Sequence, residues 1–139
     1  MPLDVKHVGI VVRDIGRSME QFRTLCGLGP FTVRESEAKG TVSEKTTLRK
    51  RKLALAQAGP IEIELVEPAE GEHAWEFLHK RGEGVHHLGV GVADLEKEVA
   101  RFKEMGIGVL QSHEGERYRI AYMDTEDVAG IVLELQQKK

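Results

Sequence analysis

The fold is decided by the stretch Gly84-Val85-His86-His87-Leu88-Gly89-Val90-Gly91-Val92-Ala93-Asp94, because a second copy of it lies near the N-terminus as His7-Val8-Gly9-Ile10-Val11-Val12-Arg13-Asp14. A constant offset of 80 residues aligns the two copies. The alignment continues through Ile15/Leu95, Met19/Val99, Phe22/Phe102 and Leu25/Met105. Two copies, rather than three or more, predict a paired-module domain and not a solenoid.

Composition and charge describe an ordinary globular protein. The 139 residues are 40% hydrophobic and 31% charged, with a net charge of -3. No apolar run approaches the roughly 18 residues that span a bilayer, and residues 1–20 lack a basic segment followed by an apolar signal core. We therefore expect a cytoplasmic protein that binds neither nucleic acid nor membrane. The single cysteine, Cys26, is expected to be a buried structural thiol.

The repeat predicts one domain, residues 1–139, built from two modules at about 1–70 and 82–139. Modules of ~70 residues bury too little apolar surface to be stable alone, so we expect them to share an interface. Apolar stripes on both modules also predict a homodimer with one site per subunit.

Each copy is predicted to have the element order βαβββ. In the first copy, residues 5–12 form a strand, Asp14 caps a helix that ends near Gly27, and strands over 53–58 and 61–66 flank the turn Gly59-Pro60. A helix over 72–80 connects the copies. The second copy has a strand over 85–92, a helix over 95–105 and strands over 107–111, 117–123 and 131–136.

Residues 31–51 have the least regular pattern. They predict two edge-like strands or a loop, with a turn at Lys39-Gly40. The basic cluster 49–52 has two interpretations. It is a solvated strand edge, where lysine discourages edge-to-edge pairing, or an anion-binding rim for a phosphate-bearing substrate.

Two histidines and two glutamates recur at matching places in otherwise apolar strands. A buried carboxylate is costly unless it is paired or bound to a metal. Imidazole and carboxylate together suit a first-row divalent ion, and two of each give a neutral site with positions left for water or substrate. The sequence therefore predicts one divalent metal per chain (Co, Ni, Mn, Zn or Fe), bound by His7, Glu64, His87 and Glu134.

The other histidines are not assigned to this site. Strand alternation turns His86 to the face opposite His87. His73, His79 and His113 fall on a helix or in loops and are expected to be surface residues.

The chain resembles the vicinal oxygen chelate superfamily of glyoxalase I, bleomycin-resistance proteins, extradiol dioxygenases and methylmalonyl-CoA epimerase, and in particular its epimerase branch. The resemblance covers nearly the whole chain except 31–51, and its motifs are His7-Val8-Gly9-Ile10, the stretch 63–68, the stretch 77–87 and the stretch 130–135. It implies an α+β fold in which two tandem βαβββ modules form an eight-stranded, half-open barrel-like sheet around a metal. It also implies the four ligands named above, and such proteins are often homodimers.

The resemblance implies an isomerase that removes and returns a proton α to a thioester or carbonyl, as a methylmalonyl-CoA epimerase-like racemase does. Its substrate would be a small molecule such as an acyl-CoA or glutathione thioester. Glu134 is the predicted base. Epimerase-type relatives supply a further glutamate from the strand before Glu64, where an ungapped register places Leu53. Either Glu44 substitutes for it, or the reaction is not a two-base epimerisation.

Other functions remain open at this point. A glyoxalase-type lyase would isomerise a glutathione hemithioacetal with one shuttling base. An extradiol dioxygenase uses two histidines and one carboxylate, which four protein ligands argue against. A non-catalytic small-molecule binding or resistance protein needs no metal, so the retained ligands speak against it.

Overall fold

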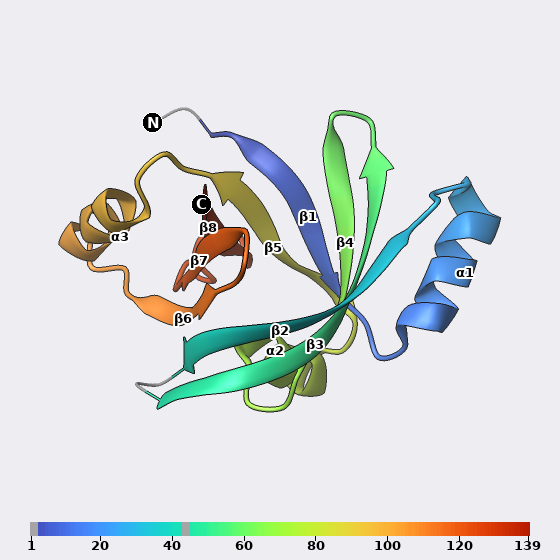
Figure 1. Ribbon diagram of the computed structural model, residues 1–139, viewed down its shortest axis with the longest axis horizontal. Helices are drawn as coiled ribbons and strands as arrows, with labels where there is room; N and C mark the ends of the chain where they lie inside the picture. Colours follow the sequence, from blue (N-terminus) through green and yellow to red (C-terminus); the bar gives the residue numbers. More distant parts are fainter. Residues whose placement is uncertain (1–2, 43–44) are drawn as a thin grey trace.

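Eight strands form one strongly curled sheet in the part of the chain that the computed structural model describes, residues 3–42 and 45–139 with the side chains of 3–35 and 50–139 (Figure 1). The hydrogen-bonded order is β1-β4-β3-β2-β6-β7-β8-β5, and β5 pairs back to β1. The strands are β1 (Val5–Val11), β2 (Thr32–Val42), β3 (Lys45–Ala58), β4 (Ile61–Glu67), β5 (Gly84–Gly91), β6 (Val109–Glu114), β7 (Tyr118–Met123) and β8 (Val132–Lys138).

The predicted βαβββ unit occurs twice. β1, α1 (Ile15–Cys26), β2, β3 and β4 form the first copy, and β5, α3 (Leu95–Glu104), β6, β7 and β8 form the second. The helix α2 (His73–Arg81) connects them. In each copy the first and last strands pair in parallel, and the two first strands, β1 and β5, pair antiparallel at the centre. This confirms the predicted α+β class.

The helices begin and end where local sequence signals place them. Asp14 accepts a 3.0 Å hydrogen bond from the backbone of Arg17, and Asp94 accepts one of 3.1 Å from Lys97. Such caps satisfy backbone donors that the first helical turn leaves unpaired. Gly27 ends α1 in the left-handed conformation, with φ 68°. Among the described helices, none is long and apolar enough to cross a membrane.

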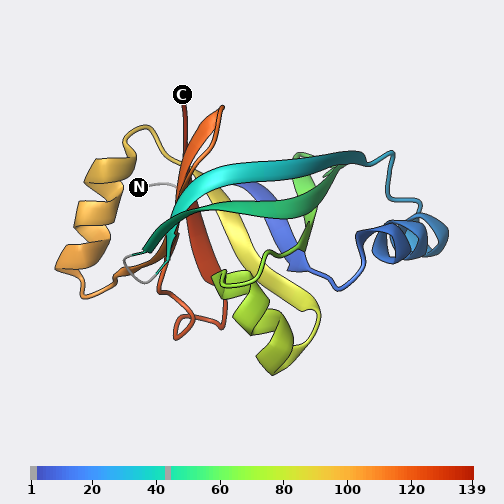
Figure 2. The same cartoon turned by 60° about the horizontal axis from the view of Figure 1, so that its bottom comes forward.

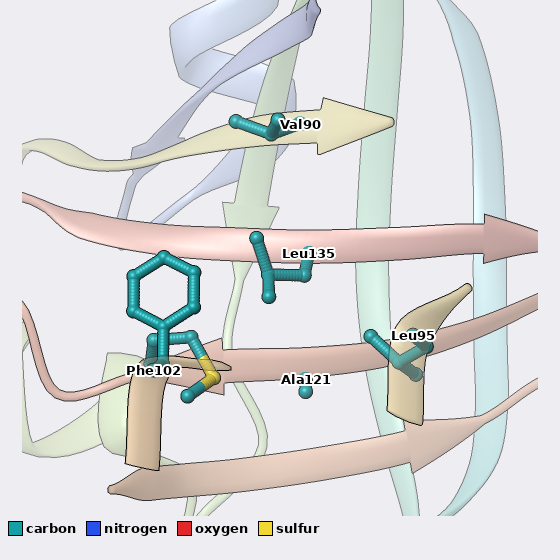
Figure 3. Packing of buried hydrophobic residues seen from close by; sticks show 6 residues of the cluster. Val90, Leu95, Phe102, Ala121 and Leu135 are labelled. Atoms are coloured by element: carbon teal, nitrogen blue, oxygen red, sulfur yellow. The ribbon is translucent and has the colours of Figure 1, made fainter. Parts of the chain in front are cut away.

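The apolar core lies between the outer face of the sheet and the helices α1 and α3, which sit at opposite ends of the molecule (Figures 1 and 2). Phe102 of α3 packs with Val90 and Leu135 of the sheet, as Figure 3 shows. In the cluster beneath α1, Ala54 and Leu65 of the sheet pack with Phe22 of the helix. Because side chains alternate along a strand, the neighbours of these residues point into the concave face.

Residues 31–51 differ from the prediction. They belong to β2 and β3, a long hairpin in which Lys39 and Gly40 are paired strand residues rather than a turn. Neither strand is an edge, because β3 also pairs with β4 and β2 also pairs with β6 through Lys39–Val42. The hairpin is long because it must reach the second copy to join the two halves of the sheet. Glu44 lies outside the described residues.

The C-terminal end of α1 is more exposed than predicted. Cys26 is exposed, so its assignment as a buried thiol is wrong. Leu25 is 84% exposed, and its counterpart Met105 is 54% exposed. The apolar stripe that contacts the sheet therefore ends at Phe22, because the last turn of α1 extends past the sheet that it covers.

Candidate metal centre

Four side chains from four strands converge on the concave face of the sheet. The Nε2 atoms of His7 and His87 are 3.2 Å apart. His87 Nε2 lies 2.9 Å from Glu134 Oε2 and 3.5 Å from Glu64 Oε1, and His7 Nε2 lies 3.6 Å and 3.9 Å from the same two oxygens. All four atoms lie within 4.8 Å of one another. The structure thus brings together the four residues that the sequence singles out.

The repeated glycines make room for this cluster. In the antiparallel pair of β1 and β5, Gly9 lies opposite His87 and Gly89 lies opposite His7. A Cβ atom on either glycine would lie 2.0 Å from Cε1 of the facing imidazole. On their parallel sides, Gly9 pairs with Glu64 and Gly89 pairs with Glu134. The duplicated His-x-Gly motif therefore builds two matching halves of one site.

His86 does not face away from His87, as simple alternation predicted. β1 pairs Gly9 with His87 but Ile10 with Val85, so His86 is the extra residue of a β-bulge. The bulge interrupts the alternation, and both His86 and His87 are buried. His86 Nδ1 lies 2.9 Å from His87 Nδ1, behind the ring that enters the cluster.

Opposite charges shift the pKa values of the cluster. Burial lowers the pKa of both His87 and His7, but Glu134 and Glu64 raise it more, to about 9 for His87 and above the usual value for His7. Burial raises the pKa of Glu134, but the two histidines lower it further, to well below its usual value. In the metal-free cluster His87 therefore holds a proton at neutral pH. A metal ion would compete with this proton for the lone pair on Nε2 of His87.

The donor set fits a divalent metal ion. Two imidazoles and two carboxylates balance a charge of +2, and both donor types bind first-row ions at about 2.0–2.2 Å. Ligands at that distance are separated by about 3–3.4 Å. The separations that involve the two histidines run from 2.9 Å to 3.9 Å, and all four donor atoms lie within 4.8 Å of one another. These four residues could therefore hold one ion without a change in the backbone.

A cavity of about 670 Å³ opens onto the cluster, and His7, Glu64 and Glu134 form part of its wall. Leu53 and Leu55 of β3 also line it. Its lining also includes the exposed charged residues Arg34, Glu35, Glu116 and Arg117. A cavity of this size and mixed lining suits a small-molecule ligand.

A buried polar cluster beside this cavity was not predicted. Arg51 Nη1 donates a 3.2 Å hydrogen bond to Glu72 Oε2 and lies 3.0 Å from His113 Nε2. Gln111 also donates to Glu72 Oε2, at 3.1 Å. Burial lowers the pKa of Arg51, but Tyr122 and Glu72 raise it more, so the guanidinium stays charged. Arg51, His113 and Tyr122 line the cavity.

This cluster corrects two sequence interpretations. The interpretation of segment 49–52 as a solvated strand edge is wrong for Arg51. Side chains alternate along β3, and Arg51, Leu53 and Leu55 all line the cavity. His113 is buried rather than on the surface, and the side chain of His73 is only 18% exposed. The position of Arg51 could have been found from strand alternation. Arg51 lies four residues before Leu55, so both side chains are on one face of β3, and Leu55 pairs with Glu64 of the site. His79 is exposed, as predicted.

Comparison with known proteins agrees with this architecture. The sequence model of the Glyoxalase/Bleomycin resistance protein/Dioxygenase superfamily matches residues 6–122. The uncharacterized protein YqjC of Bacillus subtilis (strain 168) is 27% identical over an alignment of 139 positions that covers 96% of this chain and 91% of YqjC. The hypothetical protein BH1468 from Bacillus halodurans C-125 superposes with a TM-score of 0.74 at 26% identity, covering 100% of this chain and 96% of that chain. Methylmalonyl-CoA epimerase from Streptomyces coelicolor in complex with 2-nitronate-propionyl-CoA superposes equally well, with a TM-score of 0.74, 26% identity and 98% coverage of both chains. The chain belongs to the Glyoxalase/Bleomycin resistance protein/Dioxygenase superfamily.

Proposed function

We propose that this chain is a metal-dependent isomerase that removes and returns the proton α to a thioester carbonyl, as a methylmalonyl-CoA epimerase-like racemase does. The observation that carries the proposal is the pairing of two carboxylates, Glu64 and Glu134, with His7 and His87 at the wall of one cavity. The similarity to an epimerase in complex with an acyl-CoA compound supports this class of substrate.

The four clustered residues would hold one divalent cation. That cation supplies Lewis-acid polarisation of a carbonyl oxygen and balances the negative charge that develops as the α-proton leaves. The rings of His7 and His87 would hold it, and each ring packs directly against the facing glycine, Gly89 or Gly9.

Glu134 is the proposed base. Its pKa lies well below the usual value while His87 and His7 contact it. It gains basicity only when one of its oxygens is released toward the substrate, because a carboxylate held by positive charge is a weak proton acceptor. Glu134 lines the cavity, so such an oxygen would face the bound substrate.

Glu64 is the proposed second acid or base. Epimerisation needs a proton acceptor on one face of the α-carbon and a donor on the other. Glu64 and Glu134 occupy equivalent positions beside Gly9 and Gly89, on the two sides of the cluster. This arrangement supplies two carboxylates without Glu44, and Leu53 then serves as an apolar wall of the cavity.

Arg51 favours a substrate that carries an additional negative charge. It is a buried cation in the cavity wall, and only its Nη1 atom makes the hydrogen bonds to Glu72 and His113. A guanidinium has five N–H donors, so the group retains capacity for a substrate carboxylate. Burial and the charge of Glu134 raise the pKa of Tyr122 well above its usual value, so its hydroxyl stays available as a donor.

A second candidate is glyoxalase-type isomerisation of a glutathione hemithioacetal. Leu53 favours it, because Leu53 stands where epimerase-type relatives supply a glutamate and the cavity wall there is apolar. A binding or resistance protein without turnover is the third outcome.

Proton NMR in D₂O separates these functions. The metal-loaded protein is incubated with a panel of 2-methyl-branched acyl-CoA esters, including methylmalonyl-CoA, and with hemithioacetals. Loss of the α-proton signal from an acyl-CoA supports the epimerase, and conversion of a hemithioacetal to a thioester supports the lyase. Saturable binding with neither reaction would overturn the proposal that the protein is an enzyme. A homodimer stays a prediction, and sedimentation at micromolar concentration tests it.

A further inference from the structure

Two hydrogen bonds and one histidine–carboxylate contact form a chain that connects the candidate metal centre to the surface of the molecule. His87 Nδ1 lies 2.9 Å from His86 Nδ1, and His86 Nε2 lies 2.9 Å from His73 Nδ1. His73 Nε2 lies 2.9 Å from Glu126 Oε1. Exposure rises along the chain, from 2% of the side chain at His87 to 18% at His73 and 27% at Glu126.

Three separate segments contribute to this chain. Glu126 lies in the connection between β7 and β8, His73 begins α2, and His86 is the bulge residue of β5. Arg81 Nη2 donates a 3.2 Å hydrogen bond to Glu126 Oε2 and so holds the outer end. The ring of Phe77 packs edge-on against His86 at 5.1 Å. The contacts thus join two segments of the second copy to the helix between the copies.

We propose that Glu126, His73 and His86 are positioning residues that fix the tautomer of His87 and thereby set the metal affinity of the centre. This inference rests on the proposed role of His87 as a ligand. None of the three residues would touch the metal.

The direction of every hydrogen bond follows from the outer end. Glu126 Oε1 lies 2.9 Å from Nε2 of His73, and a carboxylate oxygen there favours a proton on Nε2 over a lone pair, so His73 accepts at Nδ1. His86 must then donate from Nε2 and accept at Nδ1. His87 must in turn donate from Nδ1, which leaves the lone pair on Nε2. With all three rings neutral, the chain has this one arrangement.

That arrangement is the one that metal binding needs. His87 Nε2 lies 2.9 Å from Glu134 Oε2, and two acceptors at that distance repel unless a proton or a metal ion lies between them. The negative charge of Glu126 at the far end also strengthens His87 as an electron donor. In metalloproteins, loss of such an outer partner typically weakens metal binding by about 10–100-fold.

Competition between the metal-free protein and a chromophoric chelator for Zn²⁺ and Co²⁺ measures the effect. His86→Leu removes both hydrogen bonds, and we expect about 10–100-fold weaker binding. His86→Asn retains an acceptor for His87 Nδ1 and should bind more tightly than His86→Leu. His73→Ala and Glu126→Ala should weaken binding less, in the same direction. The matched controls are His79→Ala on the same helix and Asp127→Ala beside Glu126, which should bind as the wild type does.

A double-mutant cycle distinguishes a connected chain from local damage. If the residues act through one another, His73→Ala has no further effect in a His86→Leu background. Nitrogen NMR of the Zn²⁺-loaded, histidine-labelled protein gives a second readout, in which His86 and His73 should both carry the proton on Nε2. A His86 proton on Nδ1, or variants that bind as tightly as the controls, would overturn the inference while the metal site stands. A wild-type protein that binds neither ion would overturn both the metal site and the inference.

Discussion

The imidazole of His87 occupies the space that any side chain at residue 9 would need, because a Cβ atom on Gly9 would lie 2.0 Å from its Cε1 atom. Gly9→Ala must therefore push the ring out of the cluster, since real Cβ contacts do not reach that distance. We expect Gly9→Ala and Gly89→Ala each to abolish tight metal binding in a protein that still folds. Chelator competition and far-ultraviolet circular dichroism check the two parts of this expectation.

Gly108→Ala is the matched control for these variants. A Cβ atom on Gly108 would meet no atom within 4 Å. Metal affinity that falls equally in Gly108→Ala would show that a general loss of stability, and not the displaced ring, causes the effect.

The buried pair of Arg51 and Glu72 predicts a large effect on stability. Their side chains are 7% and 1% exposed, so Arg51→Met leaves an unpaired carboxylate in the interior. Breaking such a pair costs about 3–5 kcal/mol of unfolding free energy. Urea denaturation measures it, with Arg119→Met as the control because Arg119 pairs with the exposed Glu96. A loss below about 1 kcal/mol, as for a surface pair, would contradict this account of Arg51.

The metal-free protein should become less stable as the pH rises from 6.5 to 9. Glu134 and Glu64 outweigh burial and raise the pKa of His87 to about 9, above its ordinary value of 6.5. A raised pKa stabilises the folded state fully below the unfolded value, and this contribution is lost as the pH rises through the folded value. At about 1.4 kcal/mol per pKa unit, the loss amounts to at most roughly 3–4 kcal/mol.

Saturating metal should reverse this trend, because the ion competes with the proton on His87 and binds more tightly as the pH rises. Denaturation at a series of pH values, with and without Zn²⁺, tests both signs. An unfolding free energy of the metal-free protein that stays level or rises over this range is incompatible with the carboxylate contacts of His87.

Glu134→Gln tests the base. The amide keeps the size of the side chain and still binds a metal through its oxygen, but it cannot accept the proton. Solvent-deuterium exchange at the α-carbon of a confirmed substrate should fall by at least ~100-fold while the metal content stays unchanged. Unchanged exchange would remove Glu134 from the mechanism.

Glu64→Gln and Glu44→Gln decide which residue is the second acid or base. If Glu64 serves one face of the substrate, Glu64→Gln preserves exchange from one enantiomer while interconversion fails, and Glu44→Gln behaves as the wild type. The reverse result would assign that role to Glu44.

The repeat made most of the fold predictable. His-x-Gly recurs because each imidazole needs a glycine across the strand pair, so the same constraint that builds the site also marks the two first strands. Asp14 is a local cap signal that predicted the start of α1, and its aligned counterpart Asp94 caps α3 in the same way. The pairing of β2 with β6 was not predictable in this way, because it depends on the length to which a charged hairpin extends.

The residues that sequence analysis misplaced depend on such non-local features. His86 is buried through a bulge, which shifts the register against β1 and leaves no mark in the apolar pattern. The charge of Arg51 predicts a surface position as long as the strands that pair with β3 on both sides are unknown. His113 is buried because Arg51 contacts it from β3, a strand far away in the sequence, in addition to Gln111 of its own strand.

Metal analysis of the purified protein tests the central claim most directly. After incubation with Zn²⁺, Co²⁺, Ni²⁺ or Mn²⁺ and removal of free ions, elemental analysis should give about one ion per chain, and His87→Ala should retain far less. A protein that stays metal-free with every ion, or a His87→Ala variant that binds as tightly as the wild type, would contradict the assignment of His7, Glu64, His87 and Glu134 as one metal centre.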